Sequence, residues 1–343
     1  MTAGTEAGTA RTEHPEPAPG GGPRTARALR VALLVGCLAL LTGPAALMLI
    51  RLTGADEDSP LAVPLAALPY ATPVTLVAMA GLLALRNRWT AAVAGLLVLV
   101  QLWWLVPRFV PAGTDVPAAA PRLRVATSNA YLGRVDPAAL VRLVREQRVD
   151  VLAVEELSPG AASALDRAGL GELMPYRAQP DGNDTVLRSR HPLTPLDPGD
   201  PAAARSMVGA RVEVAGRTVR LVAVHTYYPL GDAAKWGRGF DGLRAAAGAD
   251  TRDSVLLGDF NATVDHAPMR SLLATGLTDT HAELGRGGSP TWPVHNDDFP
   301  LLPPLIQIDH VLHGAALTAV DVSEHTLPGS DHRAVVAELA LTG

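Results

Sequence analysis

The distribution of apolar residues divides the chain into two parts near residue 110. Three long and predominantly apolar stretches precede that point, at residues 31–50, 61–85 and 91–110. Each stretch reaches the roughly 20 residues that a helix needs to cross a bilayer. Residues 31–110 are therefore predicted to form three transmembrane helices that attach the protein to a lipid bilayer.

The middle stretch contains Pro64, Pro69 and Pro73. Proline is tolerated in membrane helices when neighbouring groups satisfy the freed backbone atoms, so the span is expected over residues 74–85 with the one or two turns before them. If the prolines instead keep this stretch from crossing, two spans remain and the rest of the chain stays in the cytoplasm. A cleaved signal peptide fits less well, because about 30 residues precede the first long apolar run.

Arginines are distributed unevenly around these stretches. Three of them, Arg24, Arg27 and Arg30, precede the first stretch, and Arg86 and Arg88 join the second to the third. The first connection instead carries the acidic run 56–58. Because positive residues favour the cytoplasmic side, the N-terminus and the second connection are predicted to be cytoplasmic. Three spans make this a multi-pass protein of the cell membrane, with everything after residue 110 extracytoplasmic.

The ends of the apolar region differ in character from it. Residues 1–30 are predicted to be a disordered cytoplasmic tail, because residues 1–22 are rich in Gly, Pro, Thr, Ala and Glu and show no apolar periodicity. Residues 111–121 are interpreted as a linker, and residues 122–343 as a separate domain. The single cysteine, Cys37, lies in the first span, so this domain would hold together without disulfides.

From residue 122 onward, short apolar runs alternate with helical patterns. Strands are predicted at residues 123–128, 149–154, 185–187, 208–214, 219–225, 255–257, 308–312, 319–323 and 334–341, and helices at 137–145, 161–168 and 233–247. The helix at 137–145 has an N-cap and a proline at its first position in Asp136-Pro137. Many strands, several of them in hairpins, with few helices favour an α/β fold of two packed sheets with helices outside.

Polar residues recur where these strands end. Gly258-Asp259-Phe260-Asn261 follows an apolar run and places a carboxylate and a carboxamide two residues apart, on one face of an extended segment. The other strand ends carry Ser128-Asn129, Glu155-Glu156, His225, Ile308-Asp309-His310 and Ser330-Asp331-His332. Apart from the GDFN run, each alone is interpreted as a structural residue: a turn residue, a solvated edge, a loop cap or, for His225, a satisfied core histidine. Together they indicate one polar site built from several strands.

This ordered set resembles the endonuclease/exonuclease/phosphatase superfamily, which has a deoxyribonuclease-I-like fold. The resemblance covers most of residues 122–341 and depends most on the GDFN and terminal SDH motifs. It implies a four-layer α/β sandwich and metal-dependent hydrolysis of a phosphodiester or phosphomonoester by an activated water. The implied cofactor is Mg²⁺, or Mn²⁺ in its place. No protein partner is predicted.

The resemblance also implies roles for single residues. His332 matches the catalytic histidine, and Asp309 the carboxylate that orients it. Asp259 matches the aspartate that positions water, whereas Asn261 and His225 match catalytic contacts to phosphate oxygens.

The implied metal ligands are Glu156, Asn129 and Asp331, and Asn129 is also expected to support the phosphate. Glu155 competes with Glu156 for this role, since neighbours on a strand face opposite ways. The motif favours Glu156. Magnesium suits such a set, because it takes oxygen ligands and keeps several waters.

Some positions depart from the family pattern or leave two readings open. Ala223 stands where many members have an asparagine, and Tyr131 lies in a first motif that lacks the aspartate of some nucleases. Arg188 and Arg190 are interpreted either as phosphate contacts or as part of a solvated strand face. Trp292, in a T-W-P run, is interpreted either as a packing residue or as one that stacks on substrate.

The charge of the domain bears on its substrate. From residue 121 onward the chain carries 21 Lys and Arg and 27 Asp and Glu, for a net charge of −6, and Lys235 is its one lysine. A duplex-binding nuclease usually shows a basic surface, so the composition weakens the nuclease reading. The substrate classes left open are a phospholipid headgroup, a nucleic acid and a small phosphate ester. The alternative is a catalytically silent, membrane-tethered binding module on the same fold.

Overall fold

The computed structural model describes residues 23–197, 206–247, 251–297 and 299–343. Most of the predicted disordered tail, residues 1–22, lies outside the described residues. The first helix, α1 (Pro23–Thr53), already begins at Pro23. Residues 23–30, which the pattern assigned to the tail, are thus helical. Proline at the first helical position and the Ala, Leu and Arg that follow it favour this early start.

The N-terminal half forms a group of apolar helices. After α1 come α2 (Ala62–Leu65), the 3₁₀ turn η1 (Leu68–Tyr70), α3 (Ala71–Ala84), α4 (Arg88–Leu105) and the 3₁₀ turn η2 (Val106–Phe109). Two segments, Arg24–Thr53 and Arg88–Phe109, are long and apolar enough to cross a membrane. The third predicted span is not of this length: α3 has 14 residues, about 21 Å at 1.5 Å per residue. Pro64 and Pro69 lie in the short α2 and η1, which divide the middle stretch.

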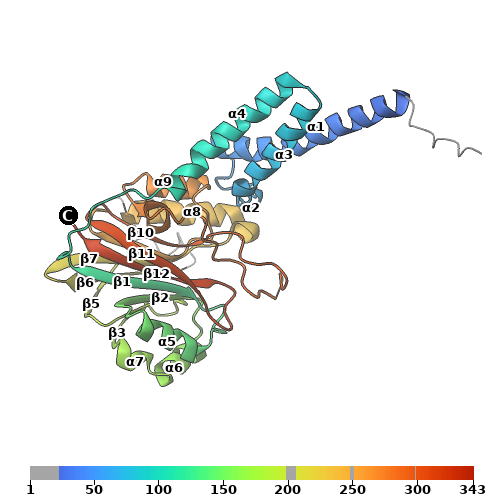
Figure 1. Ribbon diagram of the computed structural model, residues 1–343. Coiled ribbons are helices and arrows are strands. Elements are labelled where there is room, and N and C mark those ends of the chain that lie inside the picture. Colours follow the sequence, from blue (N-terminus) through green and yellow to red (C-terminus); the bar gives the residue numbers. More distant parts are fainter. Residues whose placement is uncertain (1–22, 198–205, 248–250, 298) are drawn as a thin grey trace, which may run out of the picture.

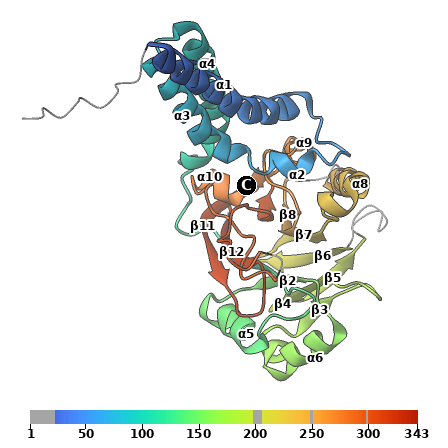
Figure 2. The same ribbon diagram turned by 90° about the vertical axis from the view of Figure 1, so that its right-hand side faces the viewer.

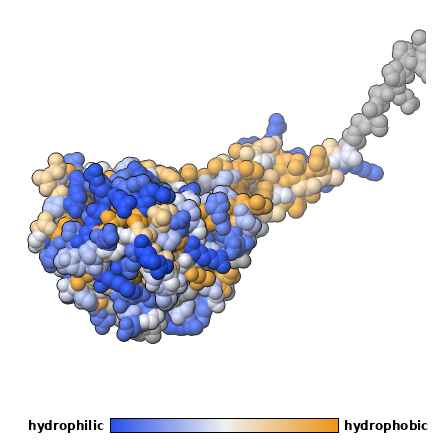
Figure 3. Space-filling model, turned by 90° about the horizontal axis from the view of Figure 1, so that it is seen from below, coloured by the Kyte–Doolittle hydropathy of each residue, from blue (hydrophilic) through white to orange (hydrophobic). Residues whose placement is uncertain are grey.

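Helices α1, α3 and α4 pack side by side and extend away from the rest of the molecule (Figure 1). Leu41, Ala78 and Ala94 are buried between them. Their outer surfaces are apolar, with Val77 64% exposed and Trp103 78% exposed. Figure 3 shows this as an apolar arm on a domain whose surface is largely polar.

The remaining residues form two six-stranded mixed sheets. Sheet A has the order β11-β12-β1-β2-β4-β3 and sheet B the order β5-β6-β7-β8-β10-β9. The strands of sheet A are β1 (Arg122–Asn129), β2 (Val151–Glu155), β3 (Tyr176–Ala178), β4 (Val186–Ser189), β11 (Leu317–Thr326) and β12 (Arg333–Leu341). Those of sheet B are β5 (Leu193–Leu196), β6 (Ser206–Val214), β7 (Arg217–His225), β8 (Ser254–Asp259), β9 (Thr278–Asp279) and β10 (Asp309–His313).

Helices cover the outer face of each sheet (Figure 2). On sheet A they are α5 (Pro137–Glu146), α6 (Pro159–Arg167) and α7 (Leu170–Leu173). On sheet B they include α8 (Pro229–Ala247) and α9 (Ala267–Leu273), with α10 (Thr280–Glu283) near the end of that sheet. Val125 and Leu257 belong to the apolar core between the sheets, and separate clusters join each sheet to its helices. The predicted α/β sandwich of two packed sheets flanked by helices is confirmed.

The apolar helices are fixed to the sandwich by buried polar contacts. Asp265 lies just before α9 and pairs with Arg51 at 3.0 Å and with Arg108 at 2.5 Å. Asp56, from the connection after α1, accepts a hydrogen bond from the backbone N–H of Ala267 at 2.7 Å. We call these contacts the Asp265 junction. Arg51 lies near the end of α1, and Arg108 lies in η2, directly after α4. Both are thereby bonded to the loop between β8 and α9.

Candidate active site

Polar side chains from both sheets meet at one edge of the sandwich. The parallel strands β1 and β2 end with Asn129 opposite Glu155, and the parallel strands β7 and β8 end with His225 opposite Asp259. Asp309 opens β10 and pairs in register with Asp259. Because parallel strands end at the same edge, residues far apart in the sequence are brought to one place.

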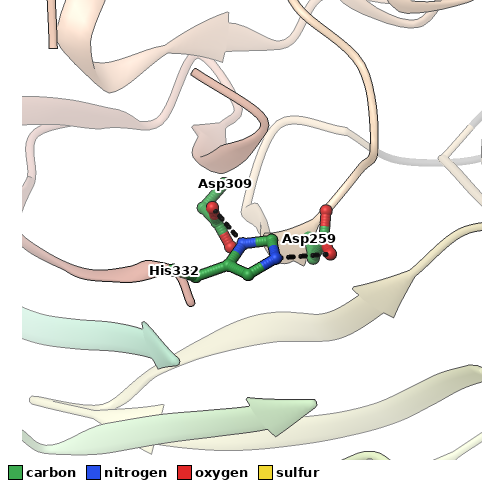
Figure 4. Close-up of side chains that lie close together, drawn as sticks. All are labelled: Asp259, Asp309 and His332. Atoms are coloured by element: carbon green, nitrogen blue, oxygen red, sulfur yellow. Dashed lines mark hydrogen bonds and ion pairs between the residues drawn. The ribbon is translucent and has the colours of Figure 1, made fainter. Parts of the chain in front are cut away.

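His332 lies between two aspartates at this edge (Figure 4). Its Nδ1 is 2.9 Å from Oδ2 of Asp309, and its Nε2 is 3.8 Å from Oδ2 of Asp259. All three side chains are buried. This is the arrangement of a histidine that one carboxylate orients while its second nitrogen remains directed toward the site.

The charges of this group control its protonation. Burial alone would lower the pKa of His332, but the carboxylates of Asp309 and Asp259 raise it to about 10. Burial raises the pKa of Asp259 to about 7, and the nearby Asp309 adds to this rise while His332 opposes it. Two groups that interact this strongly titrate as a pair. The Asp259–His332 pair therefore holds a proton near neutral pH, although the 3.8 Å between Nε2 and Oδ2 is too long for a direct hydrogen bond.

The position of Asp259 depends on the glycine before it. Gly258 has a φ of +147°, which L side chains rarely adopt, and a Cβ there would lie 1.9 Å from the backbone oxygen of Val224. Glycine thus lets β8 approach β7 closely. The carboxylate of Asp259 is then held by the backbone N–H of Asn261 at 2.8 Å and by Nδ2 of Asn129 at 3.1 Å.

Asn129 is itself fixed from two sides. Its Oδ1 accepts a hydrogen bond from the backbone N–H of Tyr131, and its backbone oxygen accepts one from Oγ of Ser330. Ser330 also accepts a hydrogen bond from the backbone N–H of His332 at 3.1 Å. The serine of the terminal motif therefore connects the end of β1 to the histidine.

Glu155 and Glu156 have different environments. Glu155 is fully buried and accepts a hydrogen bond from Oγ1 of Thr127 at 2.8 Å, and burial raises its pKa well above the usual value. Glu156 has a left-handed φ of 52°, and its side chain is 15% exposed. Its Oε2 accepts from the backbone N–H of Leu132 at 3.0 Å, and its Oε1 lies 3.5 Å from Nε2 of His225. Glu156 is thus the more exposed of the two and lies beside His225, whereas Glu155 is buried and close enough to Asp309 and Asp259 for their charges to raise its pKa.

His225 and Asn261 complete the sheet B side of the site. Nε2 of His225 lies 4.0 Å from Oδ2 of Asp259, and the histidine is 1% exposed. Nδ2 of Asn261 donates to the backbone oxygen of Thr226 at 3.2 Å, which orients the amide. Both residues lie where the sequence motif led us to expect them, next to Asp259.

Asp331 is held by two residues outside the motifs used above. Its Oδ2 accepts hydrogen bonds from Nδ2 of Asn296 at 2.5 Å and from Nε1 of Trp292 at 3.3 Å. Its Oδ1 lies 3.8 Å from Nε2 of His332. Trp292 is thus a positioning residue for Asp331 as well as a packing residue. Asn296 escaped sequence analysis because it lies in a loop without periodicity.

The oxygen donors of this site suit a hard cation. The ligand atoms of Asp259, Asp309 and His332 lie within 4.8 Å of one another, but His332 is paired with Asp309. Magnesium prefers oxygen ligands, as Glu156 offers from its partly exposed carboxylate. Of the predicted ligands, Glu156 lies beside His225, with Oε1 3.5 Å from Nε2, and Asp331 lies beside His332, with Oδ1 3.8 Å from Nε2. The two carboxylates are therefore next to different histidines.

The arginines of β4 lie away from these residues. Arg188 is 6% exposed and pairs with Asp166 of α6 at 2.6 Å, so the reading of a solvated strand face is wrong for it. NH2 of Arg190 lies 3.5 Å from the backbone oxygen of Val144 in α5. The described side-chain hydrogen bonds of both arginines are with the helices over sheet A.

A cavity of about 610 Å³ opens beside Glu156. Leu132, Leu157, Pro159 and Ala162 give it an apolar wall, and Arg177 is its one basic lining residue. The cavity therefore adjoins the candidate metal ligand and offers space for a group attached to a phosphate.

A sequence model described as the Endonuclease/Exonuclease/phosphatase family matches residues 126–332. The match begins in β1 and ends at His332, so it includes all the motif residues of the site. No protein of curated function matches the chain significantly in sequence.

Solved structures share the fold. An endonuclease/exonuclease/phosphatase from Beutenbergia cavernae is 23% identical, with a TM-score of 0.51 over 65% of this chain and 72% of that chain. TDP2 of D. rerio, complexed with a single-strand DNA product, is 18% identical, with a TM-score of 0.52 over 64% and 98%. Truncated Caenorhabditis elegans TDP2 is 17% identical, with a TM-score of 0.51 over 64% and 97%. These likenesses establish the fold.

Proposed function

The chain belongs to the endonuclease/exonuclease/phosphatase family, and on this basis we propose that it is a membrane-anchored, divalent-metal-dependent phosphoesterase. The observation that carries the proposal is the buried group of His332, Asp309 and Asp259 at the edge shared by both sheets. A silent binding module would have no chemical need for this charged group, whose burial is costly.

The proposed metal ligands are Glu156 and Asn129, with Asp331 on the side of His332. Their oxygen donors fit Mg²⁺, and Mn²⁺ takes similar ligands. A bound divalent ion would offset negative charge on the phosphate oxygens.

The protein side chains account for the proton transfer. Asp259 orients a water for attack on phosphorus, and the P–O bond to the leaving group breaks as the new P–O bond forms. The proton released by the water enters the Asp259–His332 pair, the pair gives a proton to the oxygen of the leaving group, and Asp309 stabilises the cationic form of His332. Asn261 and His225 contact the phosphate oxygens and stabilise their increased charge in the transition state.

The proposed anchor consists of α1, α3 and α4. NH2 of Arg30 donates to the backbone oxygen of Leu85 at 3.0 Å, so the start of α1 lies beside the end of α3. At the opposite end, the guanidinium of Arg51 lies 4.2 Å from the ring centroid of Trp104 in α4. Helices α1 and α4 therefore lie side by side, and the shorter α3 packs against them and ends beside the start of α1.

This arrangement supports the predicted topology. The Asp265 junction holds the sandwich at the Arg51 end, whereas Arg30 and the connection between α3 and α4 lie at the other end. With the arginine-rich end in the cytoplasm, the sandwich is extracytoplasmic.

The functional test uses the full chain, purified in detergent, with a chromogenic phosphodiester and a chromogenic phosphomonoester. We expect turnover that requires Mg²⁺ or Mn²⁺ and that falls sharply in H332A and D259N. Turnover that is absent with either metal, or that is unchanged in both variants, would overturn the proposal. Competition by single-stranded DNA, by phospholipid headgroups and by inositol phosphates would then separate the substrate classes.

A further inference from the structure

The loop before β10 exposes an unusual number of apolar side chains. Residues 299–305 read Phe-Pro-Leu-Leu-Pro-Pro-Leu, and we call this segment the apolar loop. Leu301 is 94% exposed, Leu302 is 44% exposed and Phe299 is 41% exposed. We propose that the apolar loop inserts into the interface of the bilayer beside the anchor and sets the candidate active site against the lipid surface. This inference rests on the proposed membrane anchoring.

The chemistry of the segment suits a lipid interface. No residue from 299 to 307 carries a charge, so no ionised group has to leave water. Pro300, Pro303 and Pro304 have no backbone N–H, which reduces the number of donors that would lose water on insertion. The cost of inserting irregular backbone is thus lower here than in an ordinary loop, while the leucines supply apolar area.

The apolar loop is continuous with the proposed anchor. The hydroxyl of Tyr70, at the start of α3, donates to the backbone oxygen of Leu305 at 2.6 Å. Tyrosine is enriched where membrane helices meet water, and Tyr70 is 46% exposed. In Figure 1, the segment between α10 and β10 projects on the side toward which α1 and α4 extend. A bilayer around the anchor therefore lies in reach of Leu301 and Leu302.

The apolar loop also connects to the candidate site. The ring of Phe299 meets that of Trp292 edge to face, with centroids 5.6 Å apart. Trp292 in turn donates to Asp331, the neighbour of His332 in the terminal motif. A loop seated on lipid would hold this wall of the site at the bilayer surface. A phosphoester carried by a lipid of the same bilayer is the substrate class that this placement favours.

Site-directed labelling tests the location of the loop. In a full-length C37S background, which has no other cysteine, an environment-sensitive fluorophore is attached at L301C or, as the control, at Y176C. Tyr176 is 41% exposed on β3, at the edge of sheet A. In nanodiscs we expect blue-shifted emission at position 301 and quenching by spin-labelled acyl chains, and neither effect at position 176. Equal exposure of both labels to aqueous iodide would overturn the proposal. So would protection at 301 that appears only with two protein copies per nanodisc.

An activity comparison separates this inference from the proposed function. L301S/L302S should lower hydrolysis of a phosphodiester carried on vesicle lipid, while turnover of the water-soluble chromogenic diester stays at the level of the wild type. If L301S/L302S hydrolysed both substrates at the wild-type rates, the result would contradict a lipid contact. If the wild type turned over neither substrate, the proposed function would be contradicted. The labelling experiment would still show whether the apolar loop contacts lipid.

Discussion

Nδ1 of His332 lies 2.9 Å from Oδ2 of Asp309, although 22 residues separate them in the sequence; Asp309 opens β10 of sheet B and His332 directly precedes β12 of sheet A. Asp309 is held at the start of β10, where Oγ1 of Thr291 accepts from its backbone N–H at 3.2 Å. The imidazole is therefore oriented by a carboxylate whose own position is fixed. This relationship determines what a substitution at Asp309 should do.

D309N retains a hydrogen-bonding partner for His332 but removes the negative charge that stabilises its cation. Positioned acid–base groups contribute typically 10²–10⁴-fold, so we expect kcat to fall by about 10²-fold or more with little change in KM. Steady-state kinetics with the chromogenic diester measures this. D321N, which alters an exposed carboxylate paired with Arg286, serves as the control and should keep the wild-type kcat. An unchanged kcat in D309N would remove Asp309 from the mechanism.

The two adjacent glutamates provide a matched pair for metal binding. E156Q should weaken Mn²⁺ binding by at least about 10-fold, because it removes a proposed ligand charge. E155Q should bind Mn²⁺ as the wild type does, because Glu155 is buried against Thr127 and burial keeps its pKa high. Electron paramagnetic resonance of free Mn²⁺ during titration measures binding without reference to turnover. The reverse ranking of the two variants would assign the metal to Glu155.

G258A should destabilise the sandwich. The new Cβ would meet the oxygen of Val224 at 1.9 Å in a backbone conformation that alanine rarely adopts, so a loss of about 3 kcal/mol or more is expected. The control is G160A, since a Cβ at Gly160 meets nothing within 4 Å and alanine favours the helix α6. Denaturant unfolding in detergent, followed by tryptophan fluorescence, reports the stability of both variants. Equal midpoints would show that β8 can move away from β7.

Asp265 joins two arginines in a buried setting. Burial alone would raise the pKa of Asp265, but Arg108 and Arg51 hold it below its usual value. D265N leaves two buried cations without their partner, at a cost of about 3–5 kcal/mol to the Asp265 junction. D253N breaks a more exposed pair with Arg217 and should cost less than about 1 kcal/mol. If the junction holds the domain to the helices, the rate of amide hydrogen exchange in α9 should rise in D265N and stay at the wild-type rate in D253N.

The pair of Asp279 and His310 predicts a pH dependence of stability. Burial would raise the pKa of Asp279, but His310 lowers it to about 2, and Asp279 in turn raises the pKa of His310 against its burial. The aspartate contributes stability above its unfolded pKa of about 3.9, and this is lost as the pH falls toward 2. The histidine contributes below its unfolded pKa of about 6.5, and this is lost as the pH rises through its higher folded pKa.

The contribution of the Asp279–His310 pair to the free energy of unfolding should therefore be largest between about pH 4 and 6.5, and thermal unfolding measures it. The variant H310Q should lose less stability than the wild type on going from pH 6 to pH 9, because the protonated form no longer contributes. H191Q serves as the control, since His191 is partly exposed and lies 3.9 Å from Asp150. A fall in stability as steep in H310Q as in the wild type would contradict the assignment.

Sequence reasoning located the sheets because strand periodicity and chain position are local signals. The hairpin of β6 and β7 and the strand β8 were anticipated within a few residues. The edge strands β3 and β5 were missed, since each has three or four residues and pairs on one side. Pro64 and Pro69 were the signal that shortened the middle span, and the apolar helix there runs from Leu68 to Ala84. That this helix crosses a bilayer stays a prediction.

Motif residues such as Asp259 and His332 were identifiable because their spacing follows strand ends. The contacts that support the site were not identifiable. Asn296 reaches Asp331 from a loop without periodicity, and the hydrogen bond from Trp292 to Asp331 joins residues 39 positions apart. The electrostatic interaction of Asp259 with His332 depends on a burial that appears only after folding. Asp265 gave no signal either, because its partners Arg51 and Arg108 lie more than 150 residues away in the sequence.

The Asp265 junction has a kinetic consequence for an enzyme held in a bilayer. Arg51 and Arg108 leave little freedom between helices and sandwich. If these helices are the proposed anchor, the height of His332 above the membrane would be set by the fold and not by a flexible tether. Encounter with a lipid-borne ester would then be a two-dimensional search, in which the rate depends on the number of substrate molecules per unit area of membrane. Diluting such a substrate with inert lipid would slow the reaction, while adding more buffer would not.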